Sequence, residues 1–301
     1  MKNKKLWIYL SIVLIIYPVL LFTTSFFEYS KFQSGLRQLV YDRCAASDYE
    51  IAVYVNDLSP GFAGRLFSKN HIAVNPRRGF PAASVIKLPI LAAVYLADRK
   101  GKIDINEVYK LKQSDKTGGS GMLKSTPAGR EYTYKELLSL MVSKSDNTAA
   151  NIFVEKLGFD YLNKAFADLG CLDTVINRRV CDLRARDQGI RNIISARDAA
   201  YLLEEIYRRR CVDREASEHM MQLLLNQEVD DRIPRYLPEI TKVANKTGTI
   251  RGVVHDVGII FVLPGDFILC VLTEGAPGYA EPKEFIGNLS YMIYNFWVYL
   301  K

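Results

Sequence analysis

A serine and a lysine that could work as a nucleophile and its base stand three residues apart, as Ser84 and Lys87 in the sequence Ser-Val-Ile-Lys. Apolar residues recur at helical spacing over 84–99, and residues three apart lie on one face of a helix. A serine hydroxyl is a poor nucleophile until a neighbouring base accepts its proton. Lysine can be that base where burial and nearby positive charge lower its pKa. Because such a pair arises about once by chance in a chain of this length, it becomes informative only together with other motifs.

Two later tripeptides carry side chains that suit other steps of the same chemistry. Ser-Asp-Asn at 145–147 falls between two predicted helices, where its serine could pass a proton to a leaving group and its asparagine could hold a carbonyl. The alternative role for this tripeptide is the N-cap of the second helix. Lys-Thr-Gly at 246–248 precedes the C-terminal strands, and a lysine beside a hydroxyl suits an anionic carboxylate. Its alternative is a solvated strand end.

In this order the three motifs resemble the signature set of class A β-lactamases and penicillin-binding proteins. The flanking residues agree, with Phe-Pro-Ala-Ala at 80–83 and Gly-Ser-Gly-Met-Leu at 119–123. The resemblance extends from about Ile51 to the C-terminal helix. It implies a β-lactamase-like α/β (α+β) fold and a serine hydrolase that works through an acyl-enzyme on β-lactams.

The resemblance also implies which residues carry out the reaction. Ser84 would attack the lactam or peptide carbonyl and become acylated, and Lys87 would accept or relay its proton. Ser145 would then protonate the departing nitrogen. The backbone N–H groups of Ser84 and Thr249 would form an oxyanion hole, which contributes ~3–4 kcal/mol per donor in acyl transfer.

A second set of residues would bind the substrate. By the same resemblance, Asn147 would hold the side-chain amide of the substrate. Lys246, Thr247 and Thr249 would hold its carboxylate, and Lys246 would also influence the Ser145 proton. Gly248, between them, lets a ligand approach the backbone closely.

The sequence departs from the class A pattern at the residue that activates the deacylating water. Class A enzymes carry Glu-Pro-x-Leu-Asn on a loop after the second motif, whereas this chain has no glutamate between Glu155 and Glu204. Asp182, in the matching stretch 177–186, is the nearest carboxylate and a possible replacement base. Its alternative role is an ion pair with a neighbouring arginine. Without a base, deacylation should slow by something like 10²–10⁴, so acylation is a firmer expectation than rapid turnover.

The elements that must position these motifs follow from apolar spacing and turn residues. A β-rich run at 51–55 precedes a long helical section, and strands return at the C-terminus around a Pro-Gly-Asp turn. We therefore predict an antiparallel sheet flanked by terminal helices, with an all-helical subdomain beside it and a cleft where the two meet. The predicted helices are 32–46, 84–99, 133–142, 147–157, 196–207 and 282–300, and the C-terminal strands are 253–263 and 267–272.

The N-terminal segment predicts a membrane anchor. Lysines at positions 2, 4 and 5 precede 22 uncharged residues, 6–27, and a helix of that length covers roughly 30 Å. The lysines should remain cytoplasmic, which places the rest of the chain on the extracytoplasmic side of the cell membrane as a single-pass protein. We expect an anchor at 1–29 and one hydrolase domain at 30–301. A cleaved signal peptide is the alternative, although no Ala-x-Ala-like site follows the apolar run.

Composition narrows the remaining possibilities. The 301 residues are 49% hydrophobic and 24% charged with a formal charge of +7, which excludes a disordered or low-complexity chain. The basic stretch 178–210 is interrupted by carboxylates, so we expect no nucleic-acid partner. No metal and no cofactor are expected. Cys171 and Cys181 are candidates for a disulfide or for buried thiols. A D-alanyl-D-alanine peptidase of cell-wall peptides and a β-lactam sensor without turnover remain the alternative functions.

Overall fold

A five-stranded antiparallel sheet with the strand order β2-β1-β9-β8-β7 forms the centre of the computed structural model. The structure describes residues 2–59 and 70–301, with side chains except those of 2–18 and 20–22. Three strands from the C-terminal third lie next to the N-terminal strand, because β9 pairs with both β1 and β8. The strands are β1 (Glu50–Asp57), β2 (His71–Val74), β7 (Lys242–Ile250), β8 (Val253–Phe261) and β9 (Phe267–Glu274).

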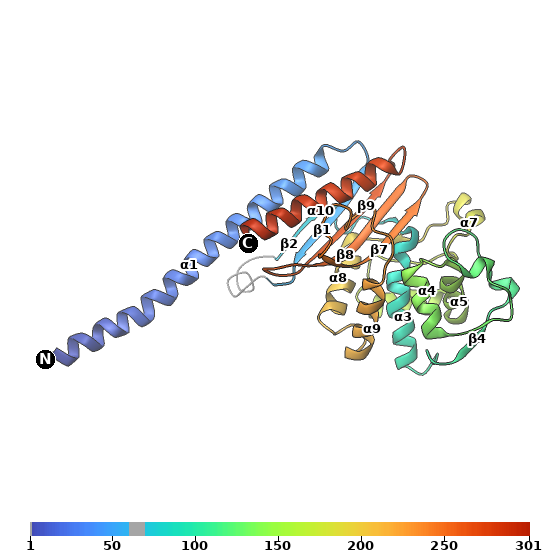
Figure 1. The fold of residues 1–301 in the computed structure, drawn as a ribbon, viewed down its shortest axis with the longest axis horizontal. Coiled ribbons are helices and arrows are strands. Elements are labelled where there is room, and N and C mark those ends of the chain that lie inside the picture. Colours follow the sequence, from blue (N-terminus) through green and yellow to red (C-terminus); the bar gives the residue numbers. More distant parts are fainter. Residues whose placement is uncertain (1, 60–69) are drawn as a thin grey trace.

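Two long helices from opposite ends of the chain cover one face of this sheet (Figure 1). They are α1 (Lys2–Ala45) and α10 (Ala280–Leu300), which run antiparallel and side by side. Phe32 of α1 meets Trp297 of α10 edge-on, with ring centroids 5.2 Å apart. Alternate residues of β1 point to this layer, so that Val53 and Val55 join its apolar core. The predicted terminal helices are therefore confirmed, and they hold the sheet from one side.

A glycine allows the two helices to approach closely. A Cβ placed on Gly35 of α1 would lie 2.7 Å from the ring of Phe296 on α10. No real side-chain contact is that short, so any larger residue would push the helices apart or displace the ring.

The opposite face of the sheet carries the section between β2 and β7, which is mainly helical (Figure 1). Its apolar core is continuous with the inner residues of the sheet, such as Ala52 and Leu272. The section is not all-helical as expected, because two short strand pairs interrupt it, β3 with β6 and β4 with β5. The helices are α3 (Lys87–Arg99), α4 (Tyr134–Ser143), α5 (Asn147–Leu157), α6 (Phe159–Asp168), α7 (Leu183–Asp187), α8 (Ala196–Tyr207) and α9 (Arg214–Leu225). The short strands are β3 (Phe80–Pro81), β4 (Val108–Lys110), β5 (Glu131–Thr133) and β6 (Ile193–Ile194).

The N-terminal half of α1 projects beyond the sheet (Figure 1). The helix continues without a break through residues 29 and 30, where the sequence places the boundary between anchor and domain. Within the described residues, no helix combines the length and hydropathy needed to cross a membrane. The predicted anchor at 6–27 falls mostly on side chains outside the described part, namely those of 6–18 and 20–22.

Candidate active site

The first motif lies where a short 3-10 helix joins α3 beneath the edge of the sheet. Ser84 belongs to η1 (Ala83–Ile86) and Lys87 begins α3. The Lys87 amine donates to Ser84 Oγ at 3.2 Å, so the spacing of three residues brings the pair together as expected. Ser84 remains partly accessible, whereas Lys87 is fully buried. Ala83 has φ +46°, a strained conformation directly before the serine.

The surroundings of Lys87 favour its neutral form. Burial and the positive charge of Lys246 lower the pKa of the Lys87 amine well below its usual value. The amine lies 2.6 Å from the backbone oxygen of Ser145, 3.1 Å from Ser145 Oγ and 2.7 Å from Asn147 Oδ1. When the amine is neutral, its two N–H groups can donate to the nearest acceptors, Ser145 O and Asn147 Oδ1, and its lone pair is then free to face the Ser84 hydroxyl.

The second motif acts as a helix cap and also contributes to the site. Asp146 is the N-cap of α5, and its carboxylate accepts from Ala149 N at 3.0 Å and from Leu123 N at 2.8 Å. Ser145, just before the cap, has φ +51°, and its hydroxyl contacts Lys87. Asn147 donates from Nδ2 to Gly118 O at 2.9 Å. The predicted N-cap is therefore confirmed, with Asp146 as the capping residue, and Ser145 and Asn147 beside it both contact Lys87.

The third motif completes the cluster from β7. Lys246 donates to Ser145 Oγ at 3.1 Å and to Thr247 O at 3.0 Å. Ser145 Oγ therefore lies 3.1 Å from each of two lysine amines, Lys87 and Lys246. Burial lowers the pKa of Lys246 to about 7, with Asp256 acting to raise it and Arg232 to lower it. The structure thus brings all three motifs together around one serine hydroxyl.

Gly248 lets β7 pass directly over the nucleophile turn. A Cβ on Gly248 would lie 3.2 Å from the backbone nitrogen of Ser84 and 3.0 Å from Val85 Cγ2. Any larger residue would crowd this contact. The close approach brings the backbone of the third motif beside the N–H of Ser84, the arrangement that an oxyanion hole between Ser84 and Thr249 requires.

Behind this turn, a buried histidine holds the strand that leads into it. His255 Nε2 is 2.9 Å from Pro81 O, and Nδ1 accepts from Thr273 N at 3.0 Å. Nε2 therefore carries the proton that is donated to Pro81. Burial lowers the pKa of His255 to about 4, so the ring stays neutral at neutral pH.

One charged residue of the site, Arg232, belongs to none of the three motifs. It lies between α9 and β7, is 3% exposed, and donates from Nη2 to Thr249 Oγ1 and from Nη1 to His255 O at 3.2 Å. Its guanidinium therefore lies beside a threonine that we expect to bind carboxylate, where a second cation strengthens anion binding. No spacing rule distinguishes it from the other 39 basic residues, so only the folded chain reveals it.

Asp182 is engaged in a structural contact. It is the N-cap of α7, and its Oδ1 accepts from Ala185 N at 3.0 Å. Among the described residues, the Asp182 side chain forms no ion pair with a neighbouring arginine, which was its alternative role. Arg179 instead pairs with Glu155 at 2.7 Å, and Arg178 donates to the backbone oxygen of Asp182 at 3.3 Å.

The sequence of the same loop can be aligned with the class A pattern through its leucine. If Leu183 is matched to the leucine of Glu-Pro-x-Leu-Asn, the glutamate position falls on Val180. Asn151, one turn after Asn147 on α5, holds the backbone of Val180 from both sides, accepting from its N–H at 2.8 Å and donating to its oxygen at 3.0 Å. Val180, which has no titratable side chain, thus has its backbone fixed beside the second motif.

Cys181, the next residue, borders the site as a thiol. A Cβ on Gly119 would lie 3.2 Å from Cys181 Sγ and 2.7 Å from Asn147 Nδ2, so the sulfur is close to the second motif. All five cysteines lie in the described part and all are free, so Cys171 and Cys181 form no disulfide. Within the described residues, no group of three or more His, Cys, Asp or Glu could hold a metal ion.

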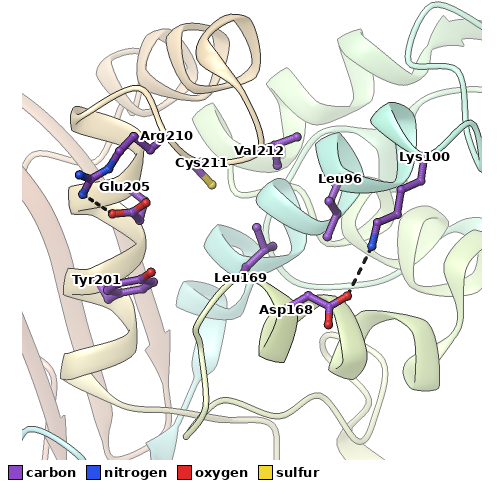
Figure 2. Close-up of a pocket in the computed structure, with 9 residues that line it drawn as sticks. All are labelled: Leu96, Lys100, Asp168, Leu169, Tyr201, Glu205, Arg210, Cys211 and Val212. Carbon is purple, nitrogen blue, oxygen red and sulfur yellow. Dashed lines mark hydrogen bonds and ion pairs between the residues drawn. The ribbon is translucent and has the colours of Figure 1, made fainter.

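A cavity of about 250 Å³ lies elsewhere, between α3, α6 and α8 (Figure 2). Leu96, Leu169 and Val212 line it with apolar surface. Its charged groups pair with one another, Lys100 with Asp168 at 3.4 Å and Arg210 with Glu205 at 2.6 Å. It shares no residue with the three motifs and is separate from the acyl-transfer chemistry.

Comparison with known proteins agrees with this arrangement. A family model described as "Beta-lactamase enzyme family" matches residues 32–297. Beta-lactamase BRO-1 of Moraxella catarrhalis is 26% identical over 181 residues, which cover 56% of this chain and 55% of that protein, so the chain spans about half the length of this relative. A β-lactamase structure from Sphaerobacter thermophilus gives a TM-score of 0.77 at 29% identity, covering 87% of this chain and 96% of that one. A mutant of PBP-A in its acyl-enzyme complex with penicillin G gives 0.76 at 26% identity, covering 88% and 96%.

Proposed function

Because the chain belongs to the β-lactamase enzyme family, we propose that it is a serine hydrolase that β-lactams acylate on Ser84. The observation that carries this proposal is the pair of short contacts made by Lys87, 3.2 Å to Ser84 Oγ and 3.1 Å to Ser145 Oγ. One neutral amine can thereby take the proton of the nucleophile and lies beside the hydroxyl that must deliver a proton to the leaving nitrogen.

Acylation follows from these contacts in four moves. Neutral Lys87 accepts the Ser84 proton as Oγ attacks the lactam carbonyl. The backbone N–H groups of Ser84 and Thr249 stabilise the oxyanion, each worth roughly 2.7–4 kcal/mol. Ser145 gives its proton to the lactam nitrogen as the C–N bond breaks. Lys87, now charged, returns a proton to Ser145 and is neutral again.

Binding of the substrate carboxylate is assigned to the end of β7. Charged Lys246 and the hydroxyls of Thr247 and Thr249 provide donors, and the guanidinium of Arg232 lies behind Thr249. Asn147 accepts from Lys87 through Oδ1 and donates one N–H to Gly118 O, so the second N–H of Nδ2 is the group proposed to hold the side-chain amide of the substrate.

Hydrolysis of the acyl-enzyme is proposed to be slow. Val180 provides no base at the position that the class A pattern gives to glutamate, and Asp182 already caps α7. General-base catalysis contributes about 10²–10⁴ to such a step. This favours a long-lived acyl-enzyme, as in a penicillin-binding D-alanyl-D-alanine peptidase or a β-lactam sensor, as the second candidate function.

A burst assay with a chromogenic cephalosporin separates these functions. The full chain and its Ser84→Ala variant are mixed with excess substrate, with Ser125→Ala, an exposed serine outside the motifs, as the matched control. A fast phase of one product per chain that requires Ser84 supports the acyl-enzyme. Sustained turnover then identifies a hydrolase, a burst alone a sensor, and release of D-alanine from a peptide a cell-wall peptidase. Equal activity of Ser84→Ala and the parent chain would refute the proposal.

Residues 6–27 are proposed to anchor the chain in the cell membrane with the hydrolase domain 30–301 outside the cytoplasm. The support is the length of the uncharged segment and the three lysines before it. Co-flotation of the full chain with phospholipid vesicles, resistant to high salt, tests the anchor. A chain that stays with the soluble fraction would contradict it.

A further inference from the structure

The most exposed of the large apolar side chains lie at one end of the sheet. Among the large hydrophobic residues whose burial the structure describes, the four most exposed are Ile240 at 90%, Leu263 at 87%, Tyr299 at 79% and Phe27 at 70%. Scattered single exposures are ordinary on a protein surface, but a cluster of them marks an interaction site. The contacts around these residues show that they belong to one end.

Strand register places two of the four together. Lys242, the first residue of β7, pairs with Phe261, the last residue of β8. Ile240 lies two residues before Lys242, and Leu263 lies two residues after Phe261. Both side chains therefore extend from the same end of neighbouring strands.

Asp57, the last residue of β1, links the other two to this end. Its carboxylate accepts from the Tyr29 hydroxyl at 3.1 Å and pairs with the Lys301 amine. Phe27 lies two residues before Tyr29, and Tyr299 two residues before Lys301. The β8–β9 turn is also adjacent, since a Cβ on Gly265 would lie 3.2 Å from the Lys301 amine. Phe27, Leu263 and Tyr299 thus lie near the same end of the sheet as Asp57.

At this end of the sheet, α1 leaves the domain (Figure 1). The C-terminus lies beside the helix there, and the N-terminal half of α1 continues outward. The uncharged sequence 6–27 ends at Phe27, within the same continuous helix. An apolar surface of the domain is therefore continuous with the segment that we propose as the anchor.

We propose that this exit surface, made of Phe27, Ile240, Leu263 and Tyr299, inserts into the interfacial layer of the lipid bilayer. The inference rests on the proposed anchor and adds a second contact between the domain and the membrane. Tyrosine is favoured at this depth, and an apolar side chain there is removed from water without entering the hydrocarbon centre.

Insertion would set the orientation of the active site. Lys242 and Gly248 lie six residues apart on β7, which at about 3.3 Å per residue separates the exit surface from the nucleophile turn by roughly 20 Å. Exposed Lys31 and Lys242 lie near the same end, where they can meet lipid phosphates. A helix alone would leave the domain free to tilt, whereas the exit surface holds the active-site opening at a fixed height above the bilayer.

The test uses the full chain in phospholipid vesicles made with or without brominated acyl chains, which quench nearby fluorophores. Leu263→Cys carries an environment-sensitive label, and Val108→Cys is the matched control. Val108 is also exposed, at 56%, and lies on β4 at the far end of the molecule from α1 (Figure 1). The labelled parent chain gives the background from the native cysteines. Flotation of each sample reports the anchor independently.

We expect the label at 263 to lose emission in brominated vesicles and the label at 108 to keep it. A chain that floats while both labels keep their emission would overturn the exit surface and leave the anchor standing. A chain that does not float overturns both. Shielding of the 263 label from aqueous iodide without bromine quenching, together with a dimeric mass, would assign this surface to a second copy and overturn the lipid contact.

Discussion

Replacing Val180 with glutamate should convert a slow acyl-enzyme into a hydrolysing one. Asn151 holds the backbone N–H and C=O of Val180 at 2.8 and 3.0 Å, and these bonds do not depend on the side chain at 180. A glutamate would therefore extend from a fixed backbone position beside the second motif. The substitution places a glutamate in a stretch that has none between Glu155 and Glu204, at the position that aligns with the glutamate of Glu-Pro-x-Leu-Asn.

The size of the effect follows from what a general base contributes. A positioned carboxylate that activates water accelerates a step by about 10²–10⁴, equivalent to roughly 2.7–5.5 kcal/mol of barrier. The substitution also has a cost, because Val180 is only 7% exposed and packs in the apolar core. We expect the free energy of unfolding to fall by about 1–3 kcal/mol, which thermal unfolding would measure separately.

The assay follows the loss of a preformed penicillin G acyl-enzyme by intact mass spectrometry. Val180→Gln is the matched control, with the same side-chain length but no base. Val180→Glu should deacylate at least about a hundredfold faster than the parent chain, while Val180→Gln should not. Adding Asn151→Ala to Val180→Glu should remove most of the increase in the deacylation rate, because the two hydrogen bonds that hold the backbone at 180 are lost. Equal deacylation by the glutamate and glutamine variants would refute this assignment of the loop.

Three further predictions concern charged groups near the site. Carboxylate binding needs charged Lys246, whose pKa is about 7. The second-order rate constant of acylation should therefore fall about tenfold per pH unit above pH 7. Stopped-flow rate constants that stay constant up to pH 9 would contradict this. Asp182→Asn should leave deacylation and stability unchanged because asparagine also caps helices, while Asp182→Ala should lower the free energy of unfolding by about 1 kcal/mol; slower deacylation in Asp182→Asn would instead make this carboxylate the base. Arg232→Ala should slow acylation by a carboxylate-bearing cephalosporin by roughly 10–100-fold, because a charged hydrogen bond is lost. Acylation by the methyl ester of the same compound should slow much less. An equal effect on both compounds would assign Arg232 a purely structural role.

The sequence predicted the elements and motifs that depend on a local pattern of residues. The predicted helices at 147–157 and 196–207 have the same ends in the structure, because their apolar spacing and the cap residues before them act locally. The three motifs also meet as their resemblance to a known family implied. The terminal helices and the strands around the Pro-Gly-Asp turn were likewise predicted, although β8 ends at Phe261, two residues earlier than expected.

The parts that were missed depend on partners distant in sequence. Strand β7 was not predicted, because its buried residues include polar Asn245, Lys246 and Thr247, whose burial is explained only by the site they form. The short pairs β3–β6 and β4–β5 lack the length that produces a readable alternation. Arg232 has no signature spacing, and its place beside Thr249 depends on how the loop before β7 folds.

In the loop around Asp182, the sequence does not indicate which groups the polar side chains contact. The sequence identifies the nearest carboxylate but not what that carboxylate contacts, and the structure uses it as a helix cap. The backbone clamp from Asn151 to Val180 joins residues 29 apart, so spacing could not have indicated it. Such polar bonds between a side chain and a distant backbone are what fix a loop in place, and they leave little trace in composition.

Through its contacts with Lys87, and through Ser145 beside that lysine, Ser84 should be the nucleophile that β-lactams acylate. The most direct measurement is peptide mapping by mass spectrometry after brief exposure of the full chain to penicillin G. We expect one penicillin adduct per chain, located on Ser84, which is lost in Ser84→Ala and formed far more slowly in Lys87→Met. The absence of an adduct, or an adduct on any other residue, would show that Ser84 is not the nucleophile.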